Sequence, residues 1–183
     1  VDDLLDVSKL ESGLLGLWRK KCQISSIVQA TIPSFEKKAQ VKNISFTWEV
    51  DENLPDVYCD GDKVGRVIIN LVTNAMKFCG EPGVVHLWAR ECDDRDEVVV
   101  GVTDNGPGID EQGLAELFQR FKQLNNSVKG STKGFGLGLN IAKELVDLNF
   151  GEMHVDSHPG AGSTFSFSVP VSRPCNILRR YLH

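Results

Sequence analysis

The sequence lacks long hydrophobic runs, and none of its cysteines has the spacing of a metal ligand. No stretch of about 18 apolar residues occurs among its 183 residues, so we expect no transmembrane segment and no membrane contact by this chain. Asp2, Asp3 and Asp6 argue against a signal peptide at the start. The five cysteines form no C-x-x-C pair, so neither a zinc site nor a complete disulfide framework is indicated. We expect free cysteines in a reducing, cytoplasmic setting, which leaves open a membrane anchor elsewhere in a longer protein.

The chain also lacks an excess of basic residues. It has 20 Lys and Arg against 25 Asp and Glu, which gives a net charge of −5 with neutral histidines. That balance argues against a broad electrostatic surface for nucleic acid. Hydrophobic residues make up 41% and charged residues 25%, which is typical of a globular chain and argues against a disordered or rod-like one. The length fits one domain with a short appendage.

Hydrophobic periodicity predicts helices and strands without a strict βαβ order. Apolar residues recur at helical spacing in the segments 25–40, 62–78 and 139–148, in a short one near 114–121, and in the opening 1–13. Strand character is found at 44–50, 84–90, 98–103, 153–157 and 164–169. Asp60 or Asp62 can cap the helix 62–78, and Pro33 is a candidate kink in the helix 25–40. The mixed order predicts an α+β fold, with helices layered on one face of a mostly antiparallel sheet.

Three polar residues form a stripe on the predicted helix 62–78. Asn70, Asn74 and Lys77 lie at positions i, i+4 and i+7, roughly a quarter-turn or more from the apolar stripe. Amide oxygens can ligate a hard divalent cation, and an ammonium group can contact phosphate oxygens. A solvated polar face would give the same pattern, so the stripe alone leaves both interpretations open.

The segment Asp104–Ile109, with the sequence DNGPGI, directly follows an apolar strand. A carboxylate at the end of a strand can accept a hydrogen bond from an exocyclic amine. Gly106 and Gly108 would let the backbone approach a flat ring without a Cβ clash. An ordinary polar turn has the same composition, so this segment also has two interpretations.

Two glycine-rich segments come later in the chain. Gly134, Gly136 and Gly138 lie at the start of the predicted helix 139–148, where free backbone N–H groups could hold a phosphate. Their G-x-G-x-G spacing is neither that of a dinucleotide fingerprint nor that of a P-loop. The second segment, 160–165 with the sequence GAGSTF, would be a hairpin turn if it stood alone.

Taken together and in this order, these segments resemble the nucleotide-binding boxes of the ATP-binding domain of sensor histidine kinases. The matching segments are NLVTNAMKF at 70–78, DNGPGI at 104–109, LFQRF at 117–121, GFGLGLNIAKELV at 134–146 and PGAGSTFSF at 159–167. The resemblance covers nearly all of 24–170, and LLDVSKLESG near the start resembles the end of that family's dimerisation and phosphoacceptor module. It implies a Bergerat-type α/β sandwich, in which about three helices back a mixed, mostly antiparallel sheet.

The resemblance also implies roles for individual residues. Asn74 would ligate Mg²⁺, with Asn70 beside it as a second candidate ligand, and Lys77 would contact phosphate; these three would be the catalytic residues. Asp104 would accept a hydrogen bond from the adenine amino group. The other cofactor-binding residues that the resemblance implies are Phe78, Gly106, Gly108, Ile109, Phe121, Lys133, Gly134, Gly136, Leu137, Gly138, Ser163 and Thr164. ATP and Mg²⁺ are therefore the expected cofactors.

Two departures from the family's pattern affect these roles. Many members have an Arg just beyond the F box that reaches phosphate, whereas here Gln123 follows Lys122. Phe135 occupies a position that is often held by a small residue, in a segment (122–135) that resembles the family's mobile ATP lid. The residue that supplies positive charge to the phosphates therefore stays open.

The resemblance divides the chain into the end of a dimerisation helix with its linker (1–20), an ATP-binding catalytic domain (21–171) and a tail (172–183). It implies transfer of the ATP γ-phosphoryl group to a histidine on the preceding dimerisation domain, in a two-component sensor kinase. None of the chain's four histidines has a phosphoacceptor context. The expected partners are the dimerisation helices and a receiver domain of a response regulator, with a monomeric isolated domain and a homodimeric full-length protein. Two alternatives stay open: an ATPase or serine kinase of the same superfamily, and a docking module that binds nucleotide without phosphotransfer.

Overall fold

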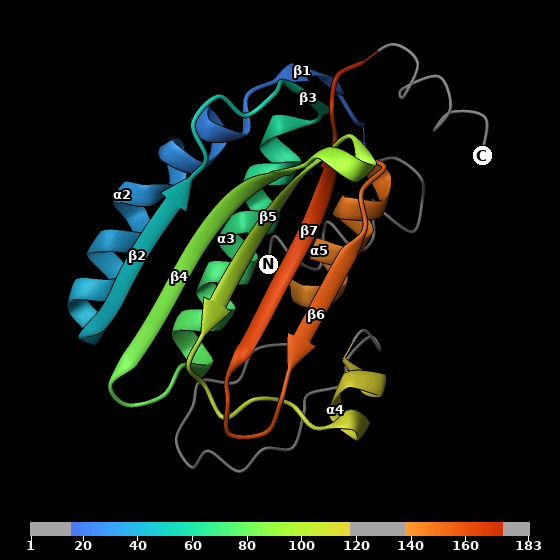
Figure 1. Ribbon diagram of the computed structural model, residues 1–183. Helices are drawn as coiled ribbons and strands as arrows, with labels where there is room; N and C mark the ends of the chain where they lie inside the picture. The colour runs from blue at the N-terminus through green and yellow to red at the C-terminus, as the bar shows by residue number, and fades with distance from the viewer. Residues whose placement is uncertain (1–15, 118–137, 174–183) are drawn as a thin grey trace.

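The computed structural model describes residues 16–117 and 138–173, which form a sheet covered on one face by helices (Figure 1). The five strands of the sheet have the order β2-β4-β5-β7-β6. The pair β2 and β4 is parallel, and the other three neighbouring pairs are antiparallel. The predicted α+β class with a mostly antiparallel sheet is therefore confirmed.

The strands of this sheet are β2 (Ile44–Val50), β4 (Gly83–Cys92), β5 (Glu97–Asp104), β6 (Met153–Ser157) and β7 (Ser163–Pro170). A smaller sheet pairs β1 (Lys20–Cys22) with β3 (Val57–Cys59). The described helices are α2 (Ile24–Lys42), α3 (Gly61–Phe78), α4 (Glu111–Glu116) and α5 (Gly138–Leu148), and a 3₁₀ turn η1 (Asp93–Arg95) joins β4 to β5. Within these described residues, no helix is both long enough and apolar enough to cross a bilayer.

Helix α3 is the centre of the helical layer, because one of its faces is almost wholly apolar. It packs against α2, α5 and β5. Asp60, one of the two predicted caps, accepts a hydrogen bond from the backbone N–H of Lys63 at 3.2 Å and so begins the helix. Each large side chain that α3 buries contributes roughly 1.5–3 kcal/mol. The buried residues of α3 are Val64, Val67, Ile68, Leu71, Val72, Ala75 and Met76.

Strand β5 lies in the middle of the sheet, and every second side chain along it points toward the helices. Val98, Val100 and Val102 are at most 1% exposed, and Asp104 continues the same face at the end of the strand. On the opposite face, the indole of Trp88 lies so close to Gly101 that a Cβ there would collide with it. The register of β5 therefore delivers a carboxylate to the helix-covered side at one end of the sheet.

The structure differs from the sequence-based prediction in two places. Helix α4 begins at Glu111 rather than near Leu114, because the Asp110 carboxylate accepts a hydrogen bond from the backbone N–H of Gly113 at 2.7 Å and caps an earlier start. The sequence predicts neither β1 nor β3, since three residues are too few for an alternating pattern.

Helix α2 continues through Pro33 to Lys42. The predicted helix at 1–13 lies outside the described residues, and the domain boundaries at 20 and 171 stay a prediction.

Candidate functional site

Three connections meet at the end of the sheet where β5 finishes, shown at the bottom of Figure 1. They are the α3–β4 loop, the β5–α4 loop and the β6–β7 turn. The backbone N–H of Gly160 in the turn donates to the carbonyl of Pro107 in the β5–α4 loop at 2.7 Å. A Cβ at Gly106 would lie 2.5 Å from the carbonyl oxygen of Phe78, the last residue of α3. Residues that are far apart in the sequence are therefore in direct backbone contact here.

Asp104 is the buried carboxylate of this region. It is 7% exposed, and its Oδ1 accepts a hydrogen bond from the backbone N–H of Gly106 at 2.7 Å. Burial raises the pKa of the Asp104 carboxyl above its ordinary value, and the backbone N–H groups of Gly106 and Ser163 act in the opposite direction. An ionised carboxylate has lone pairs for several donors, so Asp104 can accept a further N–H, such as that of an exocyclic amine.

Two glycines of the site have positive φ and no room for a side chain. Gly108 has φ +71°, and a Cβ there would collide with the carbonyl oxygen of His158. Gly162 has φ +85°, and its Cβ would collide with the carbonyl oxygen of Asp104. Both clashes are with backbone atoms, which cannot rotate away as a flexible side chain can. Glycine is therefore needed at both positions for the turn and the β5–α4 loop to approach each other.

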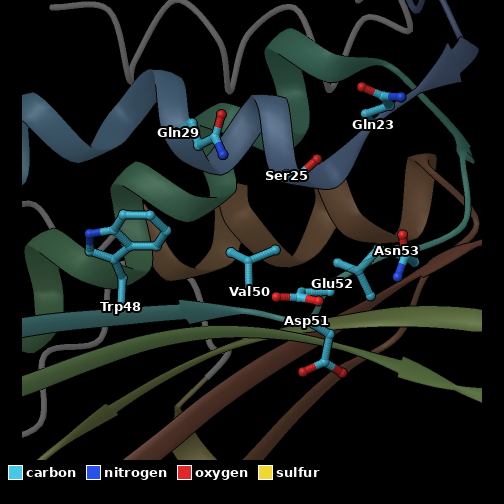
Figure 2. Close-up of a pocket in the computed structure, with 9 residues that line it drawn as sticks. Gln23, Ser25, Gln29, Trp48, Val50, Asp51, Glu52 and Asn53 are labelled. Carbon is cyan, nitrogen blue, oxygen red and sulfur yellow. The ribbon is translucent and has the colours of Figure 1, made fainter.

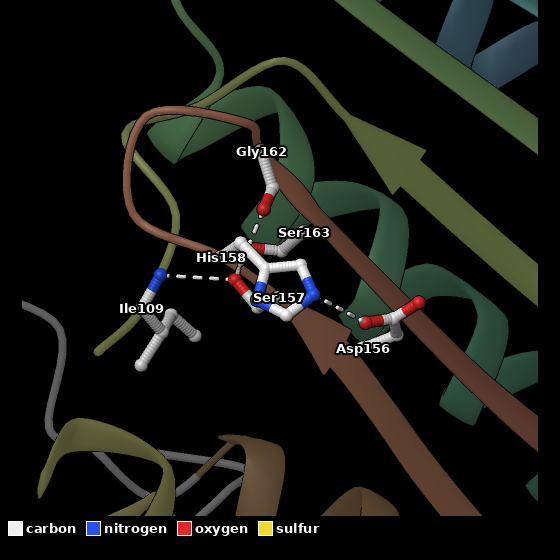
Figure 3. A network of polar contacts seen from close by, with 6 residues as sticks. All are labelled: Ile109, Asp156, Ser157, His158, Gly162 and Ser163. Atoms are coloured by element: carbon white, nitrogen blue, oxygen red, sulfur yellow. Dashed lines mark hydrogen bonds and ion pairs between the residues drawn. The ribbon is translucent and has the colours of Figure 1, made fainter. Parts of the chain in front are cut away.

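The hydroxyl of Ser157, at the end of β6, joins the same two connections (Figure 3). Its Oγ accepts from the backbone N–H of Ile109 at 2.9 Å and donates to the carbonyl of Gly162 at 3.0 Å. It also lies 2.9 Å from the Ser163 hydroxyl, which can supply the third hydrogen bond. Sequence reasoning misses Ser157, because a serine that ends a strand has no local signal for a partner 48 residues away.

Asn105 fixes the third connection, the α3–β4 loop. Its Oδ1 accepts from the backbone N–H groups of Gly80 at 3.1 Å and Val84 at 2.9 Å, and its Nδ2 donates to the carbonyl of Pro82 at 2.7 Å. Sequence reasoning includes Asn105 in the DNGPGI segment without giving it a role. Its position between Asp104 and Gly106 is the signal that could have found it, since Asn side chains often bond to backbone groups in turns.

The polar stripe lies on the second half of α3, whose last residue, Phe78, meets the β5–α4 loop at Gly106. The Nδ2 of Asn74 donates to Oδ1 of Asn70 at 3.1 Å. Gly138, the first residue of α5, approaches Asn70 so closely that a Cβ there would lie 2.7 Å from Nδ2. The Nζ of Lys77 lies 4.9 Å from the ring centroid of Phe78, whose side chain is 48% exposed. The second half of the helix thus carries amide oxygens, a cation and a half-exposed aromatic ring.

The donor set of the stripe fits Mg²⁺ bound mainly through a ligand. No group of three or more His, Cys, Asp or Glu residues that could hold a metal occurs among the described residues. Asn70 and Asn74 contribute two amide oxygens, one of which already accepts a hydrogen bond. Mg²⁺ in proteins commonly keeps waters and takes one or two protein ligands together with phosphate oxygens. The amide pair is therefore sufficient if phosphates supply the remaining ligands.

The structure separates two of the predicted site residues that are adjacent in sequence. Ser163 pairs with Asp104 across the sheet and shares its helix-covered face. Thr164 points to the opposite face, where its hydroxyl lies 3.0 Å from that of Thr103. The predicted residues Phe121, Lys133, Gly134, Gly136 and Leu137 lie outside the described residues, as do the departures from the family pattern at Lys122, Gln123 and Phe135.

A hollow of about 350 Å³ lies elsewhere on the described surface (Figure 2). It is lined by the first turns of α2, by the end of β2 and by the loop that follows, and it shares no residue with the predicted site. A smaller one of about 110 Å³ borders the β6–β7 turn and includes Ser157 and Ser163. The site is therefore identified by the convergence of its polar groups, not by the size of a hollow.

Known proteins similar to this chain are histidine kinases and related ATPases. A family model described as "Histidine kinase-, DNA gyrase B-, and HSP90-like ATPase" matches residues 59–173. The sensor histidine kinase TmoS of Ectopseudomonas mendocina is 34% identical over 177 residues, which cover 95% of this chain but 18% of TmoS.

Two solved structures are similar throughout most of the chain. Full-length ShkA in complex with AMPPNP has a TM-score of 0.80 and 29% identity, covering 93% of this chain and 35% of ShkA. The nucleotide-free catalytic domain of the histidine kinase ThkA has a TM-score of 0.71 and 26% identity, covering 84% of this chain and 96% of that domain. The chain thus corresponds in size to one domain of such proteins.

Proposed function

Because this chain belongs to the family of histidine kinase-, DNA gyrase B- and HSP90-like ATPases, we propose that it binds ATP with Mg²⁺ as the catalytic domain of a two-component sensor kinase. In this proposal it transfers the γ-phosphoryl group of ATP to a histidine on a preceding dimerisation domain. The observation that carries the proposal is the buried Asp104 carboxylate at the meeting point of three loops.

Asp104 recognises the adenine base. Its carboxylate accepts a hydrogen bond from the exocyclic amino group, while Gly106 and Gly108 let the ring approach the backbone. Guanine carries a carbonyl oxygen at the equivalent position, and two acceptors facing each other in a buried site are unfavourable. We therefore expect ATP to bind more tightly than GTP. The exposed ring of Phe78 packs along the base.

Asn74, Asn70 and Lys77 act on the phosphates. Asn74 would hold Mg²⁺ with Asn70 beside it, and a bound Mg²⁺ would supply positive charge to the phosphate oxygens. The ammonium group of Lys77 contacts phosphate directly. Phosphoryl transfer needs positioning and charge compensation more than covalent chemistry, which fits the two amides and the lysine that the described part of the site supplies.

The phosphoryl acceptor comes from outside this chain. His86, His154 and His158 lie on or next to strands of the sheet, where each has a carboxylate within ion-pair distance. His154 and His158 have 55% and 82% of their side chains exposed, which is typical of surface residues. The partners in this proposal are therefore the dimerisation helices of the same full-length protein and the receiver domain of a response regulator, in a cytoplasmic homodimer.

Calorimetric titration with Mg-ATP tests the nucleotide assignment. Asp104→Asn keeps the shape of the side chain but loses its charge, so affinity should fall by about 10- to 150-fold, the range for one hydrogen bond to a charged group. Asp156→Asn is the matched control, because Asp156 is 84% exposed at the same end of the sheet. Equal affinities in the wild type and Asp104→Asn would refute the adenine assignment.

Phosphotransfer needs a separate assay. The chain is mixed with upstream dimerisation helices and [γ-³²P]ATP, and acid-labile, base-stable phosphohistidine is the expected product. Lys77→Ala should reduce the yield. ATP binding without phosphohistidine would favour the nucleotide-binding docking module, and phosphoserine as the product would favour the serine kinase alternative.

A further inference from the structure

The residues just before β1 are fastened to a helix end that lies far away in the sequence. The guanidinium of Arg19 donates from Nε and Nη2 to the carbonyl oxygen of Leu148 at 2.9 and 2.5 Å, across 129 positions. The same guanidinium lies 4.2 Å from the ring centroid of Phe150. Arg19 therefore contacts both the last residue of α5 and the residue that follows the helix by two positions.

These contacts make Arg19 a cap for the end of α5. Carbonyl groups at the end of a helix carry partial negative charge and lack intrahelical donors, and a guanidinium supplies both charge and two donors. Phe150 has φ +61°, a conformation that is unfavourable for an aromatic residue and that places its ring against the guanidinium. A lysine could supply one donor but neither the fork nor the flat stacking surface.

A second set of contacts connects the same place to the start of α3. The backbone N–H of Trp18 donates to Oδ2 of Asp60 at 3.0 Å, while Oδ1 of that carboxylate caps α3. The backbone N–H of Asp60 in turn donates to Oδ1 of Asn149 at 2.7 Å, and Asn149 is 1% exposed. We call residues 18, 19, 60 and 148–150 the clamp.

Both helices that leave the clamp reach the candidate site. Helix α5 has 11 residues and is therefore about 16 Å long. Its far end, Gly138, lies against the Asn70 side chain, whose Nδ2 would be 2.7 Å from an added Cβ. Helix α3 starts at the clamp and carries Asn70 and Asn74. Helix α5 therefore connects the clamp directly to the contact between Gly138 and Asn70, and small sliding of packed helices is one way in which such a connection transmits a change.

We propose that Arg19 is a positioning residue that couples the segment preceding the domain to the affinity of the nucleotide site through α5. The proposal rests on the proposed nucleotide binding and adds a route for its regulation. Coupling of this kind is reciprocal, so nucleotide must tighten the clamp by the same factor by which the clamp tightens nucleotide binding.

Limited trypsin digestion of the full chain measures whether nucleotide tightens the clamp. Trypsin can cleave after Lys20 and Lys21, which follow the clamp directly. Saturating Mg-ATP should slow this cleavage about fivefold or more, the lower end of typical coupling. Arg95 in η1 is the internal control, since it lies outside the clamp with 61% of its side chain exposed. Equal slowing at both places, or at neither, would overturn the proposal.

The variants Arg19→Gln and Arg19→Lys test whether the clamp tightens nucleotide binding. Mg-ATP affinity should fall about fivefold or more in Arg19→Gln and less in Arg19→Lys, when measured by calorimetry well below the melting temperature. Lys21→Gln is the matched control, because it removes an ion pair with Asp56 only two positions after Arg19 and outside the clamp. A lower melting temperature with unchanged affinity in Arg19→Gln would show a purely structural role. Failure of the wild type to bind Mg-ATP would instead refute the proposed function.

Discussion

The two ends of the sheet are held together by different kinds of contact. At the end where β5 finishes, the Asn105 and Ser157 side chains join the loops, and backbone atoms are also in close contact. The carbonyl groups of Asp104 and His158 occupy the space that side chains of Gly162 and Gly108 would need. At the clamp end, side chains bridge the gaps, with Arg19 on the carbonyl of Leu148 and Asn149 on the backbone of Asp60. The first end leaves little tolerance for substitution, and the second depends on a few polar groups.

This difference reflects what each end has to do. At the site end, glycines with positive φ let the loops approach one another, and in the proposed function they also leave room for a flat base. The clamp end has to join the segment before β1 to helices formed later in the chain. Long polar side chains can reach across such distances and can also release, because a hydrogen bond contributes only about 1 kcal/mol net.

The largest expected effect comes from Gly162→Ala. The new Cβ would collide with the Asp104 carbonyl, and alanine is also disfavoured at φ +85°. Overpacking and backbone strain together should lower the free energy of unfolding by about 2–5 kcal/mol. Chemical denaturation of the full chain measures this change.

Gly160→Ala is the control for Gly162→Ala, because it lies in the same turn. It has a similar φ of +80°, but no heavy atom lies within 4 Å of the added Cβ. Its free energy of unfolding should therefore fall only by the cost of backbone strain, about 1–2 kcal/mol. Similar losses in both variants would show that close backbone approach does not distinguish the site end.

Much of the site end could be predicted from the sequence because its determinants are local. Asp104, Gly106 and Gly108 lie within five consecutive residues, and Asn70, Asn74 and Lys77 follow helical spacing on a single helix. The structure places the first group at the end of β5 and in the loop that follows it, and the second on the second half of α3, while their roles toward ATP stay a prediction. The same local pattern could not assign Thr164 to a face, since that depends on the register between β5 and β7.

Beyond the cap at Asp60, the contacts of the clamp could not be predicted, because their determinants are far apart in the sequence. Arg19 and Leu148 are 129 positions apart, and Asp60 and Asn149 are 89 apart, so no window of sequence contains a pair. An arginine, an asparagine and a phenylalanine near a helix end are also common residues without a distinctive spacing. β1 and β3 are missed with them, because their pairing depends on contacts of the same long range.

Asn149→Ala should produce a smaller loss than Gly162→Ala, and it tests the clamp end directly. The change leaves the buried backbone N–H of Asp60 without its acceptor and removes the bond from Nδ2 to the carbonyl of Leu145. Leaving such groups unsatisfied costs about 1–3 kcal/mol, to be read from chemical denaturation. Glu152→Ala, which removes only exposed ion pairs nearby, should change stability by less than about 1 kcal/mol. Equally small losses of stability in Asn149→Ala and Glu152→Ala would mean that the clamp stabilises the fold no more than surface ion pairs do.

The smallest expected effect is on the reactivity of Cys79, which follows α3 at the site end. Burial raises the pKa of the Cys79 thiol above its ordinary value, and the Asp104 carboxylate raises it further. The thiolate is the form that reacts with iodoacetamide, so a raised pKa slows alkylation at mildly alkaline pH. Asp104→Asn removes the like charge, lowers this pKa, and should speed alkylation of the Cys79 peptide about two- to tenfold by mass spectrometry.

Charges on either side of Cys79 allow the sign of this effect to be checked. Lys42 lowers the pKa of Cys79, so Lys42→Gln should slow its alkylation, whereas Glu81→Gln should speed it less than Asp104→Asn does. An unchanged rate in Asp104→Asn together with a slower one in Lys42→Gln would mean that Asp104 carries no charge at that pH. A neutral Asp104 could no longer act as the carboxylate acceptor for an amino group. The thiol therefore reports, without any nucleotide present, whether the site end holds the charge that the proposed recognition of adenine requires.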